Sequence, residues 1–354
     1  MTGDPPPDAI TAALRDSFGD LARNRIRGAA LDAFEAFVTA PGALTQPSLL
    51  VRCRIGAGEP EIRVVVDKPI SRWRLGRCFV PFLRRALPAV RGRAEFFALI
   101  SDTLHVPAHL EPAYAGHLRR VPLLRCDRSA TDPVSLPAIL MPDFFMQDNR
   151  YGAELREIGE AVRAHPFDRR RDVIMWRGSL SGPDYPTPAN YRSFPRFQLC
   201  RLALQHPDVL DARLCNYDVG DAALSGFLEQ EYGAPAETLP AAGFVPYKYL
   251  ISLDGVGAAW KRTATILASG AVLLLHHRWT QFFYPGLRPG VHYVPVAFDF
   301  SDLIDRYEWL AAHPERARQI AENGRRFARR VLTPPALEAY FAQVLTLCGE
   351  FSEP

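Results

Sequence analysis

Residues 247–276 have the sequence YKYLISLDGVGAAWKRTATILASGAVLLLH, in which an apolar run is followed by a glycine turn, a helical segment and a second apolar run. We predict strands at 247–253 and 271–276, with a helix at 258–269 between them. Strands that alternate with helices are typical of a parallel sheet covered by helices. This stretch therefore predicts an α/β fold.

The same alternation continues on both sides of this stretch. Further strands are predicted at 172–176, 211–216 and 292–296, and further helices at 152–164, 194–206, 219–231, 301–312, 314–331 and 335–348. The pattern predicts a doubly wound parallel sheet. Such sheets bind their ligands beyond the carboxyl ends of the strands.

The N-terminal part has a less regular pattern. Helices are predicted at 8–23 and 80–89, and strands at 61–67, 95–101 and 121–126, of which the first two should be buried. Segment 127–150 is rich in Pro, Asp and Ser and makes a plausible domain boundary. The length of 354 residues suits two domains. We therefore predict α/β domains at 1–150 and 151–334, and a C-terminal helix at 335–354 that returns to the first domain.

The composition is that of a globular protein, with 48% hydrophobic and 23% charged residues. No run of about 18 apolar residues is present, so no transmembrane helix is predicted. The start of the sequence shows no secretory signal, which predicts a cytoplasmic protein. Because the six cysteines are scattered and form no Cys-x-x-Cys pair, we expect free thiols.

The net charge of +3 is too small to indicate a nucleic-acid-binding protein, and we expect no nucleic acid as a partner. The charge is nevertheless uneven, because residues 51–100 contain 11 Lys and Arg against 4 Asp and Glu. This basic segment has two interpretations. It forms a solvated face, or it makes a peripheral contact with an anionic glycolipid or with the inner face of a membrane.

Two loops follow predicted strands and contain residues suited to an anionic ligand. In the turn after 247–253, free backbone N–H groups near a helix start favour an anion, and Arg262 can add a bidentate contact to phosphate. A plain tight turn is the alternative interpretation. The second loop, WRGSLSG at 176–182, lacks the serine spacing of a hydrolase elbow and suits a nucleotide or a sugar instead.

These two loops, together with LASGAVL at 267–273 and FFYPGLRPGVHYVPV at 282–296, resemble glycosyltransferase family 90, the CAP10-like family. The resemblance covers roughly residues 95–335. It implies a GT-B-like α/β fold, in which two Rossmann-like domains face a cleft and C-terminal helices pack back. It also implies an inverting reaction that needs no metal. The absence of an Asp-x-Asp motif from the sequence agrees with this.

The resemblance implies roles for individual residues. Asp102, after the predicted strand at 95–101, corresponds to the general base that takes the proton of the acceptor hydroxyl. The implied donor-binding residues are Ser179, Arg196, Val256, Gly257, Ala258, Ala259, Trp260, Lys261 and Arg262, with Pro142 and Asp143 from a second stretch. Trp176 and Arg177 are either donor contacts or structural, and Asp254 either orients the glycine turn or touches the donor. His276 and His277 are not predicted to bind a metal, because no carboxylate or third ligand accompanies them at metal spacing. His292 is predicted to be structural.

The function implied is transfer of a sugar, such as glucose or xylose, from a UDP-sugar to a hydroxyl of a cell-surface glycan or glycolipid. A role in lipopolysaccharide biosynthesis fits a cytoplasmic enzyme, and no cofactor or metal is expected. Two alternatives stay open. The chain is a protein O-glycosyltransferase, like the animal members that modify serine in EGF-like repeats, or it binds a nucleotide sugar without catalysis.

Overall fold

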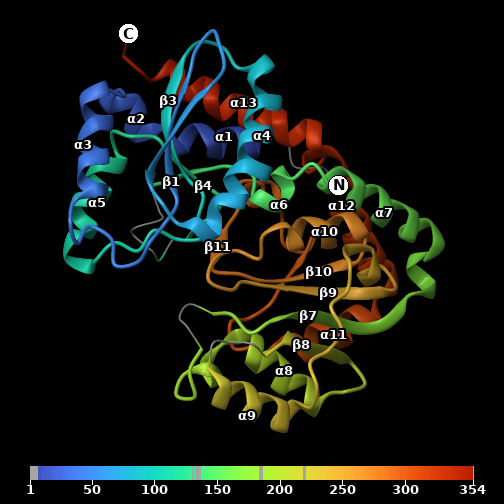
Figure 1. The fold of residues 1–354 in the computed structure, drawn as a ribbon. Coiled ribbons are helices and arrows are strands. Elements are labelled where there is room, and N and C mark those ends of the chain that lie inside the picture. The colour runs from blue at the N-terminus through green and yellow to red at the C-terminus, as the bar shows by residue number, and fades with distance from the viewer. Residues whose placement is uncertain (1–6, 130, 132–136, 183–185, 218–220, 354) are drawn as a thin grey trace. The chain divides into compact units, whose positions relative to one another are not determined.

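The computed structural model describes residues 7–129, 131, 137–182, 186–217 and 221–353, and its chain divides into two compact units (Figure 1). The first unit comprises Pro5–Tyr151, Arg278–Gly286 and Pro334–Pro354. The second unit contains Gly152–His277 and Leu287–Thr333. The predicted second domain included residues 278–286, whereas in the structure this segment clusters with the first unit.

The second unit contains a five-stranded parallel sheet with the order β12-β10-β9-β7-β8, and four of these strands follow one another in Figure 1. Its strands are β7 (Arg171–Ser179), β8 (Leu210–Asn216), β9 (Tyr247–Leu253), β10 (Val272–His276) and β12 (Val294–Pro295). The chain runs from β7 outward to β8 and then returns to the other side of β7 for β9. The direction of winding therefore reverses between β7 and β9, and in doubly wound sheets ligands bind beyond the carboxyl ends of the strands at this point.

The helices of the second unit follow the predicted alternation. They are α7 (Tyr151–Ala164), α8 (Pro195–Gln205), α9 (Ala222–Tyr232), α10 (Lys261–Ser269), α11 (Leu303–Ala312) and α12 (Pro314–Val331). Every residue of β10 is buried, as expected for a parallel strand covered on both faces. Helix α12 buries Ile320 and Phe327 on one face, whereas Arg329 and Arg330 on its last turn are exposed. Each fully buried side chain of this size stabilises the fold by about 1.5–3 kcal/mol.

The first unit has a five-stranded sheet with the order β2-β1-β3-β4-β6. Its strands are β1 (Leu50–Ile55), β2 (Glu61–Val66), β3 (Ala94–Leu99), β4 (Leu123–Arg125) and β6 (Ile139–Leu140). The sheet is mixed, because β2, β1 and β3 are antiparallel whereas β3, β4 and β6 are parallel. The resemblance implied a Rossmann-like domain here, and the antiparallel pairing of β2, β1 and β3 departs from the parallel sheet of such a domain. Only residues 56–60 join β1 to β2, too few for the crossover that a parallel pair needs.

The prediction that β2 is buried is also wrong. Strand β2 is an edge strand in which Glu61, Arg63 and Val64 are exposed, so the expectation of a buried strand at 61–67 is wrong. A strand at the edge of a sheet has one neighbour only, and its outward side chains keep their contact with water.

Helices cover the sheet of the first unit. They are α1 (Pro7–Ser17), α2 (Gly19–Asn24), α3 (Gly28–Thr39), α4 (Val80–Ala86), α5 (Glu111–Leu118), α6 (Phe144–Gln147) and α13 (Pro334–Glu350). Helix α13 is packed into this unit by Phe341, whose ring stacks on Phe82 at a centroid distance of 5.1 Å. A π-helical segment, η2 (Arg74–Phe79), runs directly into α4, and sequence analysis did not predict it.

The basic segment 51–100 is largely neutralised in the structure. Eight of its 11 basic residues form ion pairs with carboxylates: Arg52, Arg54, Arg63, Arg72, Arg74, Arg77, Arg84 and Arg85. Several partners come from outside the segment, among them Glu35, Asp148 and Glu338. This pairing favours the interpretation of a solvated face. Among the described residues, no helix combines the length and the apolar character that crossing a membrane requires.

Candidate functional site

The carboxyl ends of β7 and β9 lie side by side, because these two strands are paired. Arg196, in the first turn of α8, joins them. Its guanidinium donates to the carbonyl oxygens of Ser179 at 3.1 Å, Asp254 at 3.1 Å and Leu253 at 3.4 Å. Ser179 and Arg196, which sequence analysis assigned to donor binding, are thus in contact at the reversal point of the sheet.

Arg262 lies in the first turn of α10 and donates to the carbonyl oxygen of Arg177, two residues before the end of β7. Its guanidinium carbon is 5.8 Å from the centroid of the Trp176 ring, and that of Arg196 is 5.9 Å from the same ring. Trp176 itself is buried. The indole therefore supports two guanidinium groups, which indicates a structural role for this side chain.

The electrostatics of the two arginines favour an anionic ligand. Burial and, to a smaller extent, the charge of Arg262 lower the pKa of Arg196 to about 10. Burial likewise lowers the pKa of Arg262 to about 10. Within the described part of the chain, their hydrogen-bond acceptors are carbonyl oxygens, and neither forms an ion pair with a carboxylate. Two neighbouring cations that donate to carbonyl oxygens and have no carboxylate partner among the described residues are a suitable environment for phosphate.

The glycine turn after β9 packs tightly against Arg196. An ideal Cβ atom on Gly255 would lie 2.5 Å from Ser181 Oγ and 2.9 Å from Arg196 Nη2, so only glycine fits without displacement. The Gly255 N–H donates to the Gly257 carbonyl at 2.9 Å. Val256 is 39% exposed, whereas Gly257, Ala258 and Ala259, which were also predicted to bind the donor, are buried.

Helix α10 begins at Lys261, three residues after the predicted start at Ala258. Trp260 precedes it with a φ of 50°, a left-handed conformation that side chains other than glycine adopt at a cost. The turn is therefore longer than predicted. It places Arg262 at the second position of the helix, where the helix dipole favours a negatively charged ligand.

We expect Gly255→Ala to lower the free energy of unfolding by about 1–3 kcal/mol, because the added methyl group overpacks the turn. Chemical denaturation monitored by fluorescence measures this. Gly226→Ala in α9 is the matched control, since a Cβ there meets nothing within 4 Å. In an exposed helix interior that change should stabilise by about 0.5–1 kcal/mol. Equal stabilities for the two variants would contradict the packing argument.

Two other basic side chains of this region have carboxylate partners. Lys261 Nζ pairs with Glu154 of α7 at 2.6 Å. Arg177 forms a bidentate pair with Asp211 of β8, with both distances at 2.8 Å. Of the two interpretations of Arg177, this pair favours the structural one.

Pro142 and Asp143, the second predicted donor-binding stretch, lie in the first unit and are buried. Asp143 caps α6, because its Oδ1 accepts from the backbone N–H groups of Phe145 at 2.9 Å and Met146 at 3.2 Å. Its Oδ2 accepts from Gln281 at 3.2 Å. These contacts favour a structural role for the carboxylate, and the structure offers no support for a contact with the donor.

Asp102 follows β3 on a loop that is fixed from both sides. Ser101 Oγ accepts from the Leu49 N–H at 2.7 Å, and Ser48 Oγ donates to the Thr103 carbonyl at 3.0 Å. The Asp102 side chain is 37% exposed and pairs with Arg74 Nη1 at 2.9 Å. Arg74 is not among the predicted site residues, and its only signal in the sequence is its place in the basic segment.

The contacts of His276 and His292 are those of structural residues. His276 stacks on Phe300 with a centroid distance of 4.7 Å, and His292 Nδ1 accepts from the Arg288 N–H at 3.0 Å. Among the residues that the structure describes, no three His, Cys, Asp or Glu side chains gather as a metal site requires. That the reaction needs no metal stays a prediction.

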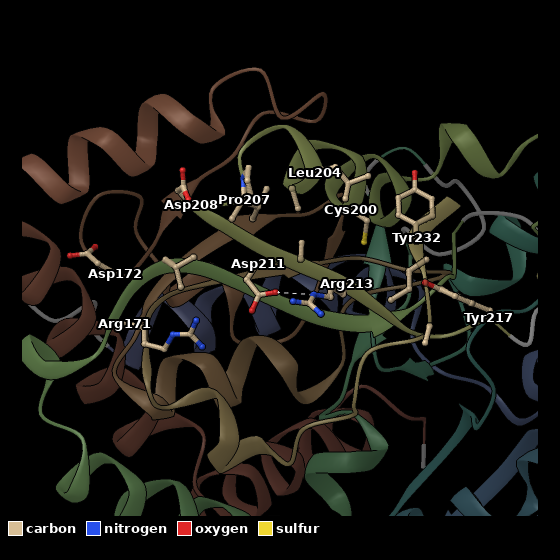
Figure 2. A pocket seen from close by; sticks show the side chains of 16 residues that line it. Arg171, Asp172, Cys200, Leu204, Pro207, Asp208, Asp211, Arg213, Tyr217 and Tyr232 are labelled. Carbon is tan, nitrogen blue, oxygen red and sulfur yellow. Dashed lines mark ion pairs between the residues drawn. The ribbon is translucent and has the colours of Figure 1, made fainter. Parts of the chain in front are cut away.

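A cavity of about 730 Å³ lies along β8, and Figure 2 shows its lining. Asp211 and Arg213, which form an ion pair at 3.4 Å, line it together with Tyr217 and Tyr232. The cavity extends from the start of β8 past its end, and none of the predicted donor-binding residues lines it. It is therefore separate from the arginine pair at the carboxyl ends of β7 and β9.

Comparisons with known proteins agree with the resemblance stated above. Protein O-glucosyltransferase 3 of Rattus norvegicus is 33% identical over 163 residues, which is 44% of this chain and 29% of that protein. Protein O-glucosyltransferase 2 of Danio rerio is 34% identical over 185 residues, or 52% of this chain and 34% of that protein. Protein O-glucosyltransferase 1 of Bos taurus is 26% identical over 216 residues, which is 61% of this chain and 51% of that protein.

The chain spans between 29% and 51% of the length of these relatives. The profile of the family described as Glycosyl transferase family 90 matches residues 95–352, a range that contains Asp102, Arg196 and Arg262. Because this match covers well over half of the chain, the protein belongs to glycosyl transferase family 90.

Proposed function

We propose that the protein is an inverting glycosyltransferase that moves a sugar from a UDP-sugar to a hydroxyl group. The observation that carries this proposal is the pair Arg196 and Arg262 at the carboxyl ends of β7 and β9, two cations with only carbonyl partners in the described residues. Family membership supports the same reaction class. We further propose that the two units correspond to the two domains of a GT-B enzyme.

In the proposed reaction, Asp102 takes the proton from the acceptor hydroxyl. The oxygen of that hydroxyl forms a bond to the anomeric carbon of the sugar, and the bond from this carbon to the diphosphate breaks with inversion. Arg196, Arg262 and the N-terminus of α10 stabilise the charge that develops on the leaving diphosphate. No residue of this scheme requires a metal or a cofactor.

The donor sugar and the acceptor are proposed by class. The relatives are named as O-glucosyltransferases, which favours glucose over xylose as the donor sugar. For the acceptor we propose a hydroxyl of a cell-surface glycan or glycolipid, such as a lipopolysaccharide core. The names of the relatives favour a second candidate, a hydroxyl on a protein.

A UDP-release assay with a panel of UDP-sugars tests the proposal. We expect release with UDP-glucose, and acceleration by one of two acceptors, a lipopolysaccharide preparation or an EGF-like repeat. GDP-mannose serves as the control donor, and release of GDP from it, measured in parallel, should be absent. Binding of UDP without release from any donor would contradict the catalytic proposal in favour of a non-catalytic nucleotide-sugar-binding protein. Absence of UDP binding would overturn both.

A further inference from the structure

Arg74 contacts the carboxylate proposed as the base. Its Nη1 lies 2.9 Å from Asp102 Oδ1 and its Nη2 lies 3.4 Å from Oδ2, so each carboxylate oxygen faces one nitrogen. The Asp102 side chain is 37% exposed and that of Arg74 is 16% exposed. The guanidinium thus approaches the carboxylate from the protein side, while part of the carboxylate stays open to solvent.

The guanidinium of Arg74 is itself held in place. Its central carbon lies 5.7 Å from the centroid of the Trp73 ring and 5.5 Å from that of Phe144. Arg74 is also the first residue of the π-helical segment η2, and such segments occur frequently at functional sites. Two aromatic contacts and a regular helical backbone therefore limit the orientations that the Arg74 guanidinium can adopt.

A second contact joins the same segments. Ser101 Oγ donates to Ser71 Oγ at 3.4 Å. Ser101 directly precedes Asp102, and Ser71 lies three residues before Arg74. Both serines are buried. The segment that begins at Ser71 therefore holds the loop of Asp102 at two consecutive residues.

We propose that Arg74 is a positioning residue for Asp102, an inference that rests on the function proposed above. The two guanidinium nitrogens of Arg74 fix the rotation of the Asp102 carboxylate, so that the remaining lone pairs of the carboxylate face the acceptor hydroxyl. When Asp102 takes the hydroxyl proton and the oxygen bonds to the anomeric carbon as UDP leaves, the ion pair with Arg74 is lost. Release of that proton to water restores the pair and prepares the site for the next turnover.

Steady-state kinetics of Arg74→Gln test the inference. We expect kcat to fall by about 10- to 100-fold, because misplacement of a catalytic group by about 1 Å can have an effect of this size. The KM for the UDP-sugar and the calorimetric affinity for UDP should stay unchanged. Arg77→Gln is the matched control, because Arg77 lies on the same segment and pairs with Asp148 at 2.7 Å. This control should keep kcat within about twofold.

Two further measurements separate positioning from a merely structural role. Added guanidinium at millimolar concentration should restore part of the kcat of Arg74→Ala, and Arg74→Lys should be intermediate, because lysine keeps the charge without the planar fork. In an Asp102→Asn background, Arg74→Gln should cause no further loss. Thermal unfolding of each variant verifies that it is folded.

The outcomes distinguish this inference from the proposed function. An unchanged kcat for folded Arg74→Gln, or a loss that adds fully to that of Asp102→Asn, overturns the positioning role and leaves the proposed base intact. Full activity of Asp102→Asn overturns the base, whatever Arg74→Gln does. An equal loss in Arg77→Gln would show that the effect arises from the segment as a whole, which also overturns the positioning role.

Discussion

Asp102→Asn is expected to lower kcat by about 10²–10⁴-fold, the contribution that a general base typically makes. Asparagine has nearly the size and shape of aspartate but cannot accept the hydroxyl proton. Asp102 lies in the first unit, whereas the arginines proposed to bind the diphosphate lie in the second. We therefore expect the calorimetric affinity for UDP to be unchanged in this variant.

Asp20→Asn provides the control for loss of a carboxylate. Asp20 belongs to the same unit and also pairs with an arginine, Arg23, but its side chain is 43% exposed on α2. Exposed pairs of this kind contribute little to stability, so both kcat and the unfolding temperature should stay close to those of the parent protein. Substantial turnover by Asp102→Asn, measured as UDP release with donor and acceptor present, would falsify the assignment of the base.

Arg262→Ala is expected to weaken the affinity for UDP by about 10- to 100-fold. A hydrogen bond to a charged group contributes about 1.5–3 kcal/mol, and about 1.4 kcal/mol corresponds to a tenfold change in affinity. Because Arg262 should contact the leaving diphosphate most strongly as its charge develops, kcat should fall as well. Arg262→Lys should recover only part of the loss, since lysine lacks the bidentate fork.

The control for this change is Arg306→Ala in α11. Arg306 lies in the same unit, is 48% exposed and pairs with Asp302 at 3.2 Å. Isothermal titration with UDP should give the parent affinity for this control. Because Arg262 also donates to the carbonyl of Arg177, thermal unfolding is measured in parallel to verify that the variant is folded. A parent-like UDP affinity in folded Arg262→Ala would argue against the diphosphate role.

The second unit was largely predictable. Parallel strands covered by helices on both faces form continuous apolar runs, and β9 and β10 are such runs in the sequence. The start of α10 was not predictable to the residue. It depends on the positive φ of Trp260, in a turn whose Gly255 packs against Arg196 from a different part of the chain.

The first unit was harder to predict because its strands are less apolar. In β1, Arg52 and Arg54 alternate with buried residues, so the segment does not stand out as a strand. Arg52 is only 11% exposed because Asp32, Glu35 and Glu95 neutralise it. Those partners come from α3 and β3, and no local sequence pattern predicts that they pair with Arg52. The antiparallel hairpin of β1 and β2 was missed for this reason.

The sequence by itself determined the α/β class and the glycine turn, and its resemblance to the family implied the side chains of the proposed chemistry, Asp102, Arg196 and Arg262. Periodicity and motif spacing are local properties, and neighbouring residues along the chain suffice to produce them. The tertiary structure alone decided the strand order that brings β7 and β9 together, and the pairing of Asp102 with Arg74 across 28 residues. Ion pairs and sheet neighbours depend on which distant segments the core brings into contact, and charge alone did not distinguish Arg74 from the other arginines of its segment.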